Sequence, residues 1–223
     1  MARILICGDS YAVNDPAYPG LHWSEQLLNY SADFEIINMA YGGCSNAMIA
    51  LQLSQGLRFN PDFVIFSFTS DGRYEFDKDS TAVPRTLEPC DMADYLKRRY
   101  TTNVYEHNTQ KSKHLIQYLS DTASSNFERI KNYFYIMYCL DRVNSLRLGF
   151  CYSLGGFEYK QDYTMWLNEN YMTNAFQPYQ AKELLTNLWN HGKKTKPFFH
   201  VDNAEIQNLF ASQCVSYITG ART

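Results

Sequence analysis

Several features that mark other classes of protein are missing from this sequence. No apolar run approaches the length of a membrane-spanning helix, and the apolar residues before Gly8 are too few for the core of a secretory signal peptide. Neither Gly-x-Gly-x-x-Gly nor a P-loop is present, which argues against a nucleotide- or flavin-binding module. We therefore expect a cytoplasmic protein that has no membrane partner and no organic cofactor.

Charge and metal-binding residues are also scarce. The 20 Lys and Arg residues are outnumbered by 23 Asp and Glu, so the net charge is -3 and no nucleic-acid-binding surface is expected. The six cysteines are scattered singly, with no C-x-x-C pair and no histidine at the spacing of metal ligands. They are expected to be reduced and mostly buried thiols, and no metal site is predicted.

What the sequence does have is the composition of a folded protein. Hydrophobic residues make up 45% of its 223 residues, and it contains 18 Tyr and 14 Phe. This length is enough to bury a full core, and it fits one domain better than two. We expect a single domain over residues 1–223, with a more polar insertion at about residues 73–125.

Apolar periodicity indicates how this domain is built. Short apolar runs that end at turn residues are typical of buried parallel strands, whereas apolar residues three and four apart indicate helices. The expected strands are residues 3–7, 34–37, 62–68 and 148–152, and the expected helices begin near residues 23, 46, 111, 126, 179 and 203. This alternation predicts an α/β fold, a three-layer α/β/α sandwich around a parallel, flavodoxin-like sheet, with a mainly helical insertion.

Three loops are expected at the carboxyl ends of the strands, where parallel sheets gather their functional groups. They are Gly8-Asp9-Ser10, Gly42-Gly43-Cys44-Ser45-Asn46 and Thr69-Ser70-Asp71. Together they offer a hydroxyl, glycine backbone amides and a polar side chain, which are the groups that acyl transfer requires. Gly-Asp-Ser also forms ordinary turns, so its position directly after the first strand is what favours Ser10 as a nucleophile.

A serine hydroxyl needs a general base at neutral pH, and His200 is the best-placed histidine. It precedes the last expected helix, whereas the other four histidines lie near the first helix, in the insertion or at a helix end. The alternative is that His200 is simply packed at a strand end.

This arrangement resembles the SGNH (GDSL) hydrolase superfamily over most of the chain except the insertion. Gly8-Asp9-Ser10 matches the first sequence block of that family, Asn38 with Gly43 and Asn46 looks like the second, and Thr69-Ser70-Asp71 stands where the third belongs. The resemblance implies that Ser10 is the nucleophile, that the backbone amides of Ser10 and Gly43 are oxyanion donors, and that His200 is the general base.

Three positions depart from the pattern of the family. The Asn of the third block, which donates to the oxyanion, falls on Asp71, and a carboxylate there would repel the oxyanion. The Asp that stands three residues before the histidine is replaced by Pro197, and Val201 replaces the Pro that usually follows it. Asp202 is the substitute for the orienting acid, although Asp202 with Glu205 also resembles a capping box at the start of the last helix.

Two functions are open at this point. The first is a serine ester hydrolase that uses a Ser-His dyad to cleave an acyl or acetyl ester of a small molecule or a glycan. The second is a catalytically impaired protein that keeps the fold for a structural or binding role. Chains with a Thr-Ser third block and a long insertion look like ones encoded by tailed bacteriophages, so a virion component with protein partners is one form of this second function.

Overall fold

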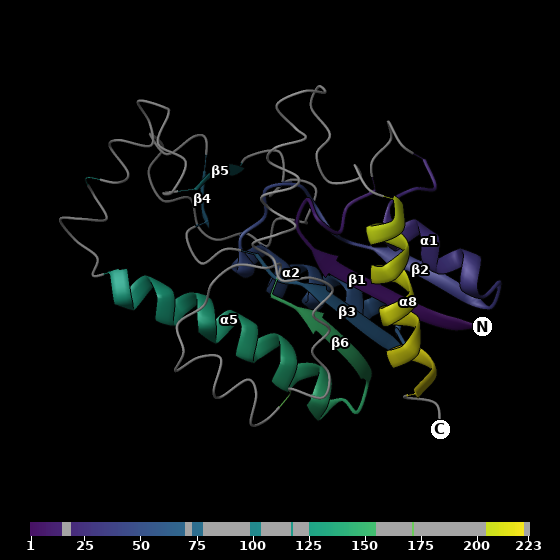
Figure 1. Ribbon diagram of the computed structural model, residues 1–223. Coiled ribbons are helices and arrows are strands. Elements are labelled where there is room, and N and C mark those ends of the chain that lie inside the picture. Colours follow the sequence, from purple (N-terminus) through teal and green to yellow (C-terminus); the bar gives the residue numbers. More distant parts are fainter. Residues whose placement is uncertain are drawn as a thin grey trace, which may run out of the picture.

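The centre of the molecule is a parallel sheet of four strands in the order β2-β1-β3-β6 (Figure 1). The strands are β1 (Ala2–Gly8), β2 (Phe34–Asn38), β3 (Phe63–Ser67) and β6 (Gly149–Ser153). The computed structural model describes residues 1–14, 19–69, 73–77, 99–103, 117, 125–154, 171 and 204–220. All four strands lie where the sequence predicted them, and the expected parallel α/β fold is confirmed.

Strands β1 and β3 lie in the middle of the sheet and are apolar along almost their whole length. Because successive side chains of a strand point to opposite faces, Leu5 and Cys7 join one core cluster while Ile4 and Ile6 join the other. Every residue of β3 is buried. A strand covered on both faces has a continuous apolar run rather than an alternating pattern, which is the signal that these segments carry in the sequence.

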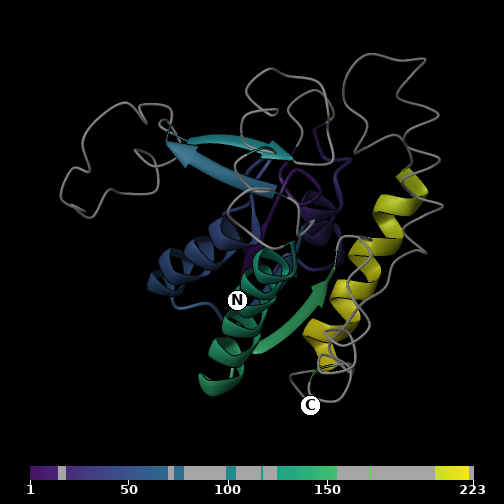
Figure 2. The ribbon, with the colours of Figure 1, turned by 90° about the vertical axis from the view of Figure 1, so that its left-hand side faces the viewer.

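Helices cover both faces of the sheet. One face carries α2 (Asn46–Gly56) and α5 (Ser125–Ser145), and the other carries α1 (Trp23–Tyr30) and α8 (Ala204–Gly220) (Figure 2). Ser45 caps α2 by accepting a hydrogen bond from the Met48 amide at 3.3 Å, as expected for a serine at that position. A short 3-10 turn, Leu57–Phe59, then leads toward β3. The expected three-layer sandwich is therefore present.

The insertion after β3 includes a two-stranded ribbon. β4 (Arg73–Asp77) and β5 (Arg99–Asn103) pair in antiparallel fashion on the side of the sheet toward which the parallel strands point (Figure 2). The signal was present in the alternation of aromatic and charged residues along Arg73-Tyr74-Glu75-Phe76-Asp77, but the polar composition of the whole insertion obscured it. The expected mainly helical insertion thus has a β part. The helix predicted near residues 111–119 lies outside the described residues except at Gln117, which is helical.

The later helices and the cysteines also lie largely as the sequence predicted. α5 and α8 each begin within one residue of the predicted position, whereas the helix expected near residue 179 lies outside the described residues. Five cysteines are described, and all are buried and free of disulfide bonds, as predicted. Within the described ranges, no helix is both long and apolar enough to cross a membrane.

Candidate active site

The sheet places the ends of β1 and β3 side by side. β1 pairs with β2 on one side and with β3 on the other. The chain that leaves β1 leads to β2 on one side of the sheet, and the chain that leaves β3 leads to β6 on the other side. The two connections therefore run in opposite directions from the boundary between β1 and β3. Parallel sheets bind their ligands at such switch points. Gly8, the last residue of β1, is in register with Ser67, the last residue of β3. The loops that begin with Asp9 and with Phe68 therefore start next to each other.

Ser10 lies in a tight turn directly after β1. The carbonyl oxygen of Asp9 accepts hydrogen bonds from the amides of Ala12 and Val13 at 3.0 and 3.1 Å, which turns the chain back around Ser10. A glycine is required just before the turn, because a Cβ atom at Gly8 would lie 2.7 Å from Cβ of Ala12. Ser10 itself is partly exposed. The turn therefore leaves Ser10 accessible at the carboxyl end of a central strand.

Two side chains from other elements hold the segment after Ser10. Asn38, the last residue of β2, donates from Nδ2 to the Ala12 carbonyl oxygen at 2.8 Å, and its Oδ1 accepts from the Ala40 amide at 2.9 Å. Trp23 of α1 donates from Nε1 to the Tyr11 carbonyl oxygen at 2.6 Å. The turn that carries Ser10 is thus attached to both β2 and α1.

The glycine loop between β2 and α2 lies against this turn. The Tyr41 amide donates to the Gly8 carbonyl oxygen at 3.1 Å, and a Cβ atom at Gly42 would lie 3.9 Å from Cβ of Ser10. Gly43 has a φ of +73°, a left-handed conformation that glycine adopts without steric cost. The loop brings Ser10 and Gly43, the two residues whose backbone amides the sequence indicated as oxyanion donors, to the same corner of the molecule.

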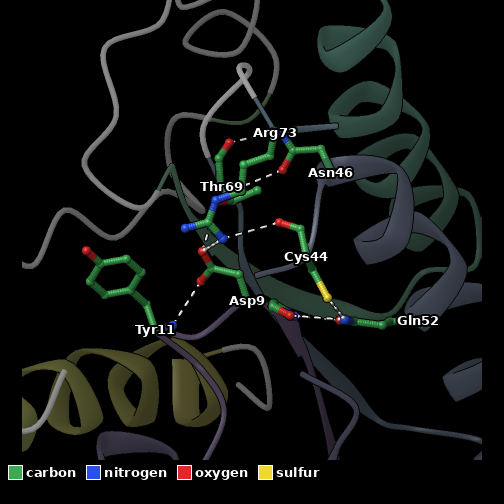
Figure 3. Close-up of polar contacts among 8 residues, drawn as sticks. Asp9, Tyr11, Cys44, Asn46, Gln52, Thr69 and Arg73 are labelled. Carbon is green, nitrogen blue, oxygen red and sulfur yellow. Dashed lines mark hydrogen bonds and ion pairs between the residues drawn. The ribbon is translucent and has the colours of Figure 1, made fainter. Parts of the chain in front are cut away.

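Asp9 is the centre of a buried polar network beside Ser10 (Figure 3). Its Oδ1 accepts from the Tyr11 amide at 2.9 Å, and its Oδ2 accepts from Thr69 Oγ1 at 2.8 Å and from Arg73 Nη1 at 2.9 Å. Burial raises the pKa of the Asp9 carboxyl above its ordinary value, and the Arg73 charge, followed by the hydrogen bonds, acts in the opposite direction. The carboxylate therefore joins the end of β1, the end of β3 and the start of β4.

Two side-chain amides of α2 complete the framework. Gln52 is fully buried and pairs with the backbone of Gly8, accepting from its amide at 2.7 Å and donating to its carbonyl oxygen at 3.0 Å. Asn46 makes the same kind of pair with the backbone of Thr69, with both hydrogen bonds at 2.9 Å. One helix therefore holds the two strand ends that flank the switch point.

The histidine of the first helix has a structural position. His22 is buried and is the N-cap of α1, where its Nδ1 lies 2.7 Å from Ser24 Oγ and accepts from the Ser24 amide at 3.3 Å. This agrees with its place among the weaker candidates for a general base. Among the residues that the structure describes, no three His, Cys, Asp or Glu side chains are grouped so that they could hold a metal ion.

Comparison with known proteins finds its matches in solved structures. No protein-family model matches the sequence, and no curated protein does. The psychrotrophic esterase EstA from Pseudoalteromonas sp. has a similar structure, with a TM-score of 0.52 at 10% identity over 99% of this chain and 98% of that one. A lipolytic protein of the G-D-S-L family from Veillonella parvula matches with a TM-score of 0.50 at 10% identity, over 97% of this chain and 98% of that one. The chain has the SGNH hydrolase fold.

A third solved structure, an acetyl xylan esterase, matches with a TM-score of 0.50 at 13% identity over 97% of this chain and 99% of that one. Within the SGNH fold, the sequence-predicted residues divide into two groups. Ser10 and Gly43 are described and lie at the same corner of the sheet. Asp71, His200 and Asp202 lie outside the described residues, as do Pro197 and Val201. Their predicted roles therefore stay predictions.

Sequence reasoning missed part of the framework of the SGNH fold in this chain. Gln52 gave a weak signal, since a polar residue at helical spacing among Met48, Ile49 and Leu53 is unusual on a buried face. Arg73 forms an ion pair with the buried Asp9 carboxylate. Nothing in the local sequence indicated that Asp9 would be the partner, because the two residues are 64 positions apart.

Proposed function

We propose that this chain is a serine ester hydrolase in which Ser10 is the nucleophile and His200 is the general base. The observation that carries the proposal is the position of Ser10, which is accessible at the end of the central strand β1 with the Gly42-Gly43 loop against it. The fold shared with an esterase and an acetyl xylan esterase supports the same reaction class. The substrate is an acyl or acetyl ester of a small molecule or a glycan.

The proposed reaction has two halves. His200 removes the proton from Ser10 Oγ as the oxygen attacks the ester carbonyl carbon, and the resulting oxyanion receives hydrogen bonds from the backbone amides of Ser10 and Gly43. The C–O bond to the alcohol then breaks, and the alcohol leaves with the proton from His200. In the second half, His200 activates a water molecule that attacks the acyl-enzyme, and the acid is released as Ser10 regains its proton. No metal or organic cofactor takes part.

Two residues set how fast this chemistry proceeds. Asp71 stands where a neutral donor would complete the oxyanion hole, so its carboxylate is expected to slow the reaction. Pro197 takes the place of the acid three residues before His200. Either Asp202 orients the imidazole instead, or the enzyme works as a Ser-His dyad with no orienting acid. We therefore expect turnover to be slow compared with that of an enzyme with a complete triad.

The same departures favour a second candidate function. Asp71 and Pro197 each remove a group that serves catalysis in the SGNH pattern, as expected if the fold is retained for a structural or binding role. A virion component that contacts other proteins is one such role. This candidate predicts a Ser10 that does not react with an electrophile.

A fluorophosphonate probe distinguishes the two candidates. In wild type, Ser10 Oγ is expected to attack the phosphorus of the probe, forming an O–P bond as the P–F bond breaks and fluoride leaves. Wild type should also hydrolyse p-nitrophenyl acetate, and Ser10→Ala should do neither. His200→Ala should lower both rates by about 100-fold or more, the usual contribution of a general base. Ser54→Ala, an exposed serine of α2, is the matched control and should behave as wild type.

The result is determined by peptide mass spectrometry of the labelled protein and by initial rates. An unlabelled wild-type Ser10, together with equal turnover in wild type, Ser10→Ala and His200→Ala, would contradict the hydrolase proposal and favour the structural role. If Ser10 is labelled and His200→Ala labels and hydrolyses at the rates of wild type, Ser10 remains the nucleophile and His200 is not its general base.

A further inference from the structure

Two side chains join the nucleophile turn, residues 8–11, to the glycine loop, residues 41–45 (Figure 3). Arg73 Nη1 donates to Asp9 Oδ2 at 2.9 Å and also to the Cys44 carbonyl oxygen at 3.4 Å. Asp9 is the neighbour of Ser10, and Cys44 is the neighbour of Gly43. One guanidinium nitrogen therefore contacts both loops. In one loop it lies next to Ser10, the source of the proposed hydroxyl nucleophile, and in the other it lies next to Gly43, the source of a proposed oxyanion-binding amide.

Gln52 joins the same two loops from α2. It pairs with the backbone of Gly8, and its Nε2 also donates to Cys44 Sγ at 3.3 Å. This side chain belongs to the core and is fully buried. Arg73 differs because it is the first residue of β4 and so belongs to the insertion. The insertion therefore contributes a contact that the core on its own does not make.

The environment of the Arg73 contact makes it stronger than an ordinary surface ion pair. The side chain of Arg73 is 14% exposed and that of Asp9 is fully buried. Arg3 and Glu35 form an ion pair of the same length, 2.9 Å, but their side chains are 47% and 45% exposed. Water screens the exposed pair and leaves the buried one largely unscreened, so the attraction between Arg73 and Asp9 is greater than that between Arg3 and Glu35 at the same length.

We propose that Arg73 is a positioning residue that holds the nucleophile turn and the glycine loop together, so that Ser10 and Gly43 act on the same ester carbonyl group. The inference rests on the proposed hydrolase function and names a residue of β4 as a part of its site. Arg73 acts through Asp9 and the Cys44 carbonyl oxygen and does not itself react. Arg73 thus adds a contact from β4 to the two that Gln52 makes from α2.

Three variants test this assignment. Arg73→Met keeps most of the side-chain length and removes every donor, and it is expected to lower kcat by roughly 10- to 100-fold with KM changed less than threefold, because misplacement weakens the transition state and not substrate binding. Arg73→Lys should recover most of kcat, since Nη1 makes both contacts and one ammonium group can replace it. Arg3→Met removes the exposed ion pair and should keep the kcat of wild type.

The single variant leaves the buried Asp9 charge without its ion-pair partner and is at risk of failing to fold. The double variant Asp9→Asn, Arg73→Met removes both charges together, so it should fold as wild type does while keeping the low kcat of Arg73→Met. Amide hydrogen exchange of residues 41–45 gives a readout that does not depend on activity. Exchange there is expected to be at least tenfold faster in the double variant and unchanged in Arg3→Met.

These outcomes separate the two proposals. If wild-type Ser10 is labelled and the Arg73 variants match Arg3→Met in kcat and in exchange, the positioning role is wrong and the hydrolase function stands. If wild type is neither labelled nor active, the hydrolase function fails, and with it any role of Arg73 in catalysis. Amide exchange of residues 41–45 then still reports whether Arg73 holds the two loops together. If exchange in the double variant equals that of wild type, this structural role of Arg73 is wrong too.

Discussion

Asp9 combines complete burial with three hydrogen-bond partners, Tyr11, Thr69 and Arg73, of which Arg73 is also its ion-pair partner. Removing a carboxylate from water raises its pKa, and a neighbouring positive charge lowers it again. At Asp9 burial is the larger effect, so the net direction is upward. The folded state therefore holds the Asp9 proton more tightly than the unfolded state does, and ionisation of this side chain costs stability.

This balance predicts a pH-dependent effect of Arg73→Met on stability. The free energy of unfolding should fall as the pH rises from about 4, the ordinary value for an aspartate, to the raised pKa of Asp9. Loss of Arg73 raises that pKa further, so the deficit of the variant relative to wild type should grow with pH and reach about 3 kcal/mol at neutral pH.

Urea unfolding midpoints between pH 4 and pH 8 measure this deficit. In an Asp9→Asn background the effect of Arg73→Met should be small and independent of pH, since no carboxyl remains to titrate. A deficit that stays constant from pH 4 to pH 8 in the native background would show that the Asp9 charge is not its cause.

At the scale of elements, β1 packs against β3 at Gly8 and against α2 at Gly56, two positions with little room for a side chain. A Cβ atom at Gly8 would lie 2.7 Å from Cβ of Ala12 and 2.9 Å from Cβ of Ser67, and both of these atoms are fixed to the backbone. A Cβ atom at Gly56, in the last turn of α2, would lie 2.5 Å from Cδ1 of Leu5, the end of a flexible side chain. The strand end is therefore the less adaptable of the two positions.

Substitution of these two glycines should have unequal effects. Gly8→Ala is expected to cost about 3 kcal/mol in the free energy of unfolding, because overpacking there must move the backbone of β3 or of the Ser10 turn. Gly56→Ala should cost less, about 1 kcal/mol, because only the side chain of Leu5 has to shift and alanine favours the helix. Chemical denaturation of both variants tests this. Equal losses in the free energy of unfolding would show that the backbone around Ser10 adjusts to an added methyl group as easily as the side chain of Leu5 does.

On the scale of the whole molecule, the two core clusters enclose every cysteine that the structure describes. Cys7, Cys44 and Cys139 lie in the cluster under α2 and α5, and Cys151 and Cys214 lie in the cluster under α8. All five are fully buried, and burial raises the pKa of the Cys7, Cys139 and Cys151 thiols. In the folded protein these three thiols therefore form thiolates less readily than in the unfolded chain, and all five are shielded from reagents in solution.

Thiol modification should consequently follow global unfolding. Under native conditions we expect a thiol reagent to modify these five cysteines at the rate of unfolding, and to do so rapidly only in denaturant. Mass spectrometry of modified peptides over time resolves each site. Rapid native modification of Cys44 alone would show that the glycine loop opens independently of the core.

The sequence by itself determined the local features of this protein. The four apolar runs became the four strands, and Gly8-Asp9-Ser10 became the turn after β1. Each of these depends on residues a few positions apart, and strand burial leaves a continuous apolar run that is visible without any structure.

Only the tertiary structure decided how these features meet. The pairing of β4 with β5 joins segments separated by more than twenty residues, and the contacts Gln52 with Gly8, Asn46 with Thr69 and Arg73 with Asp9 span 44, 23 and 64 positions. Buried polar groups need a partner because water cannot reach them, and the packing of the layers decides which groups meet. Neither the composition nor the periodicity of the sequence predicts which groups these are. The physical environment of Ser10 therefore comes from the packing of layers around a turn that the sequence already contained.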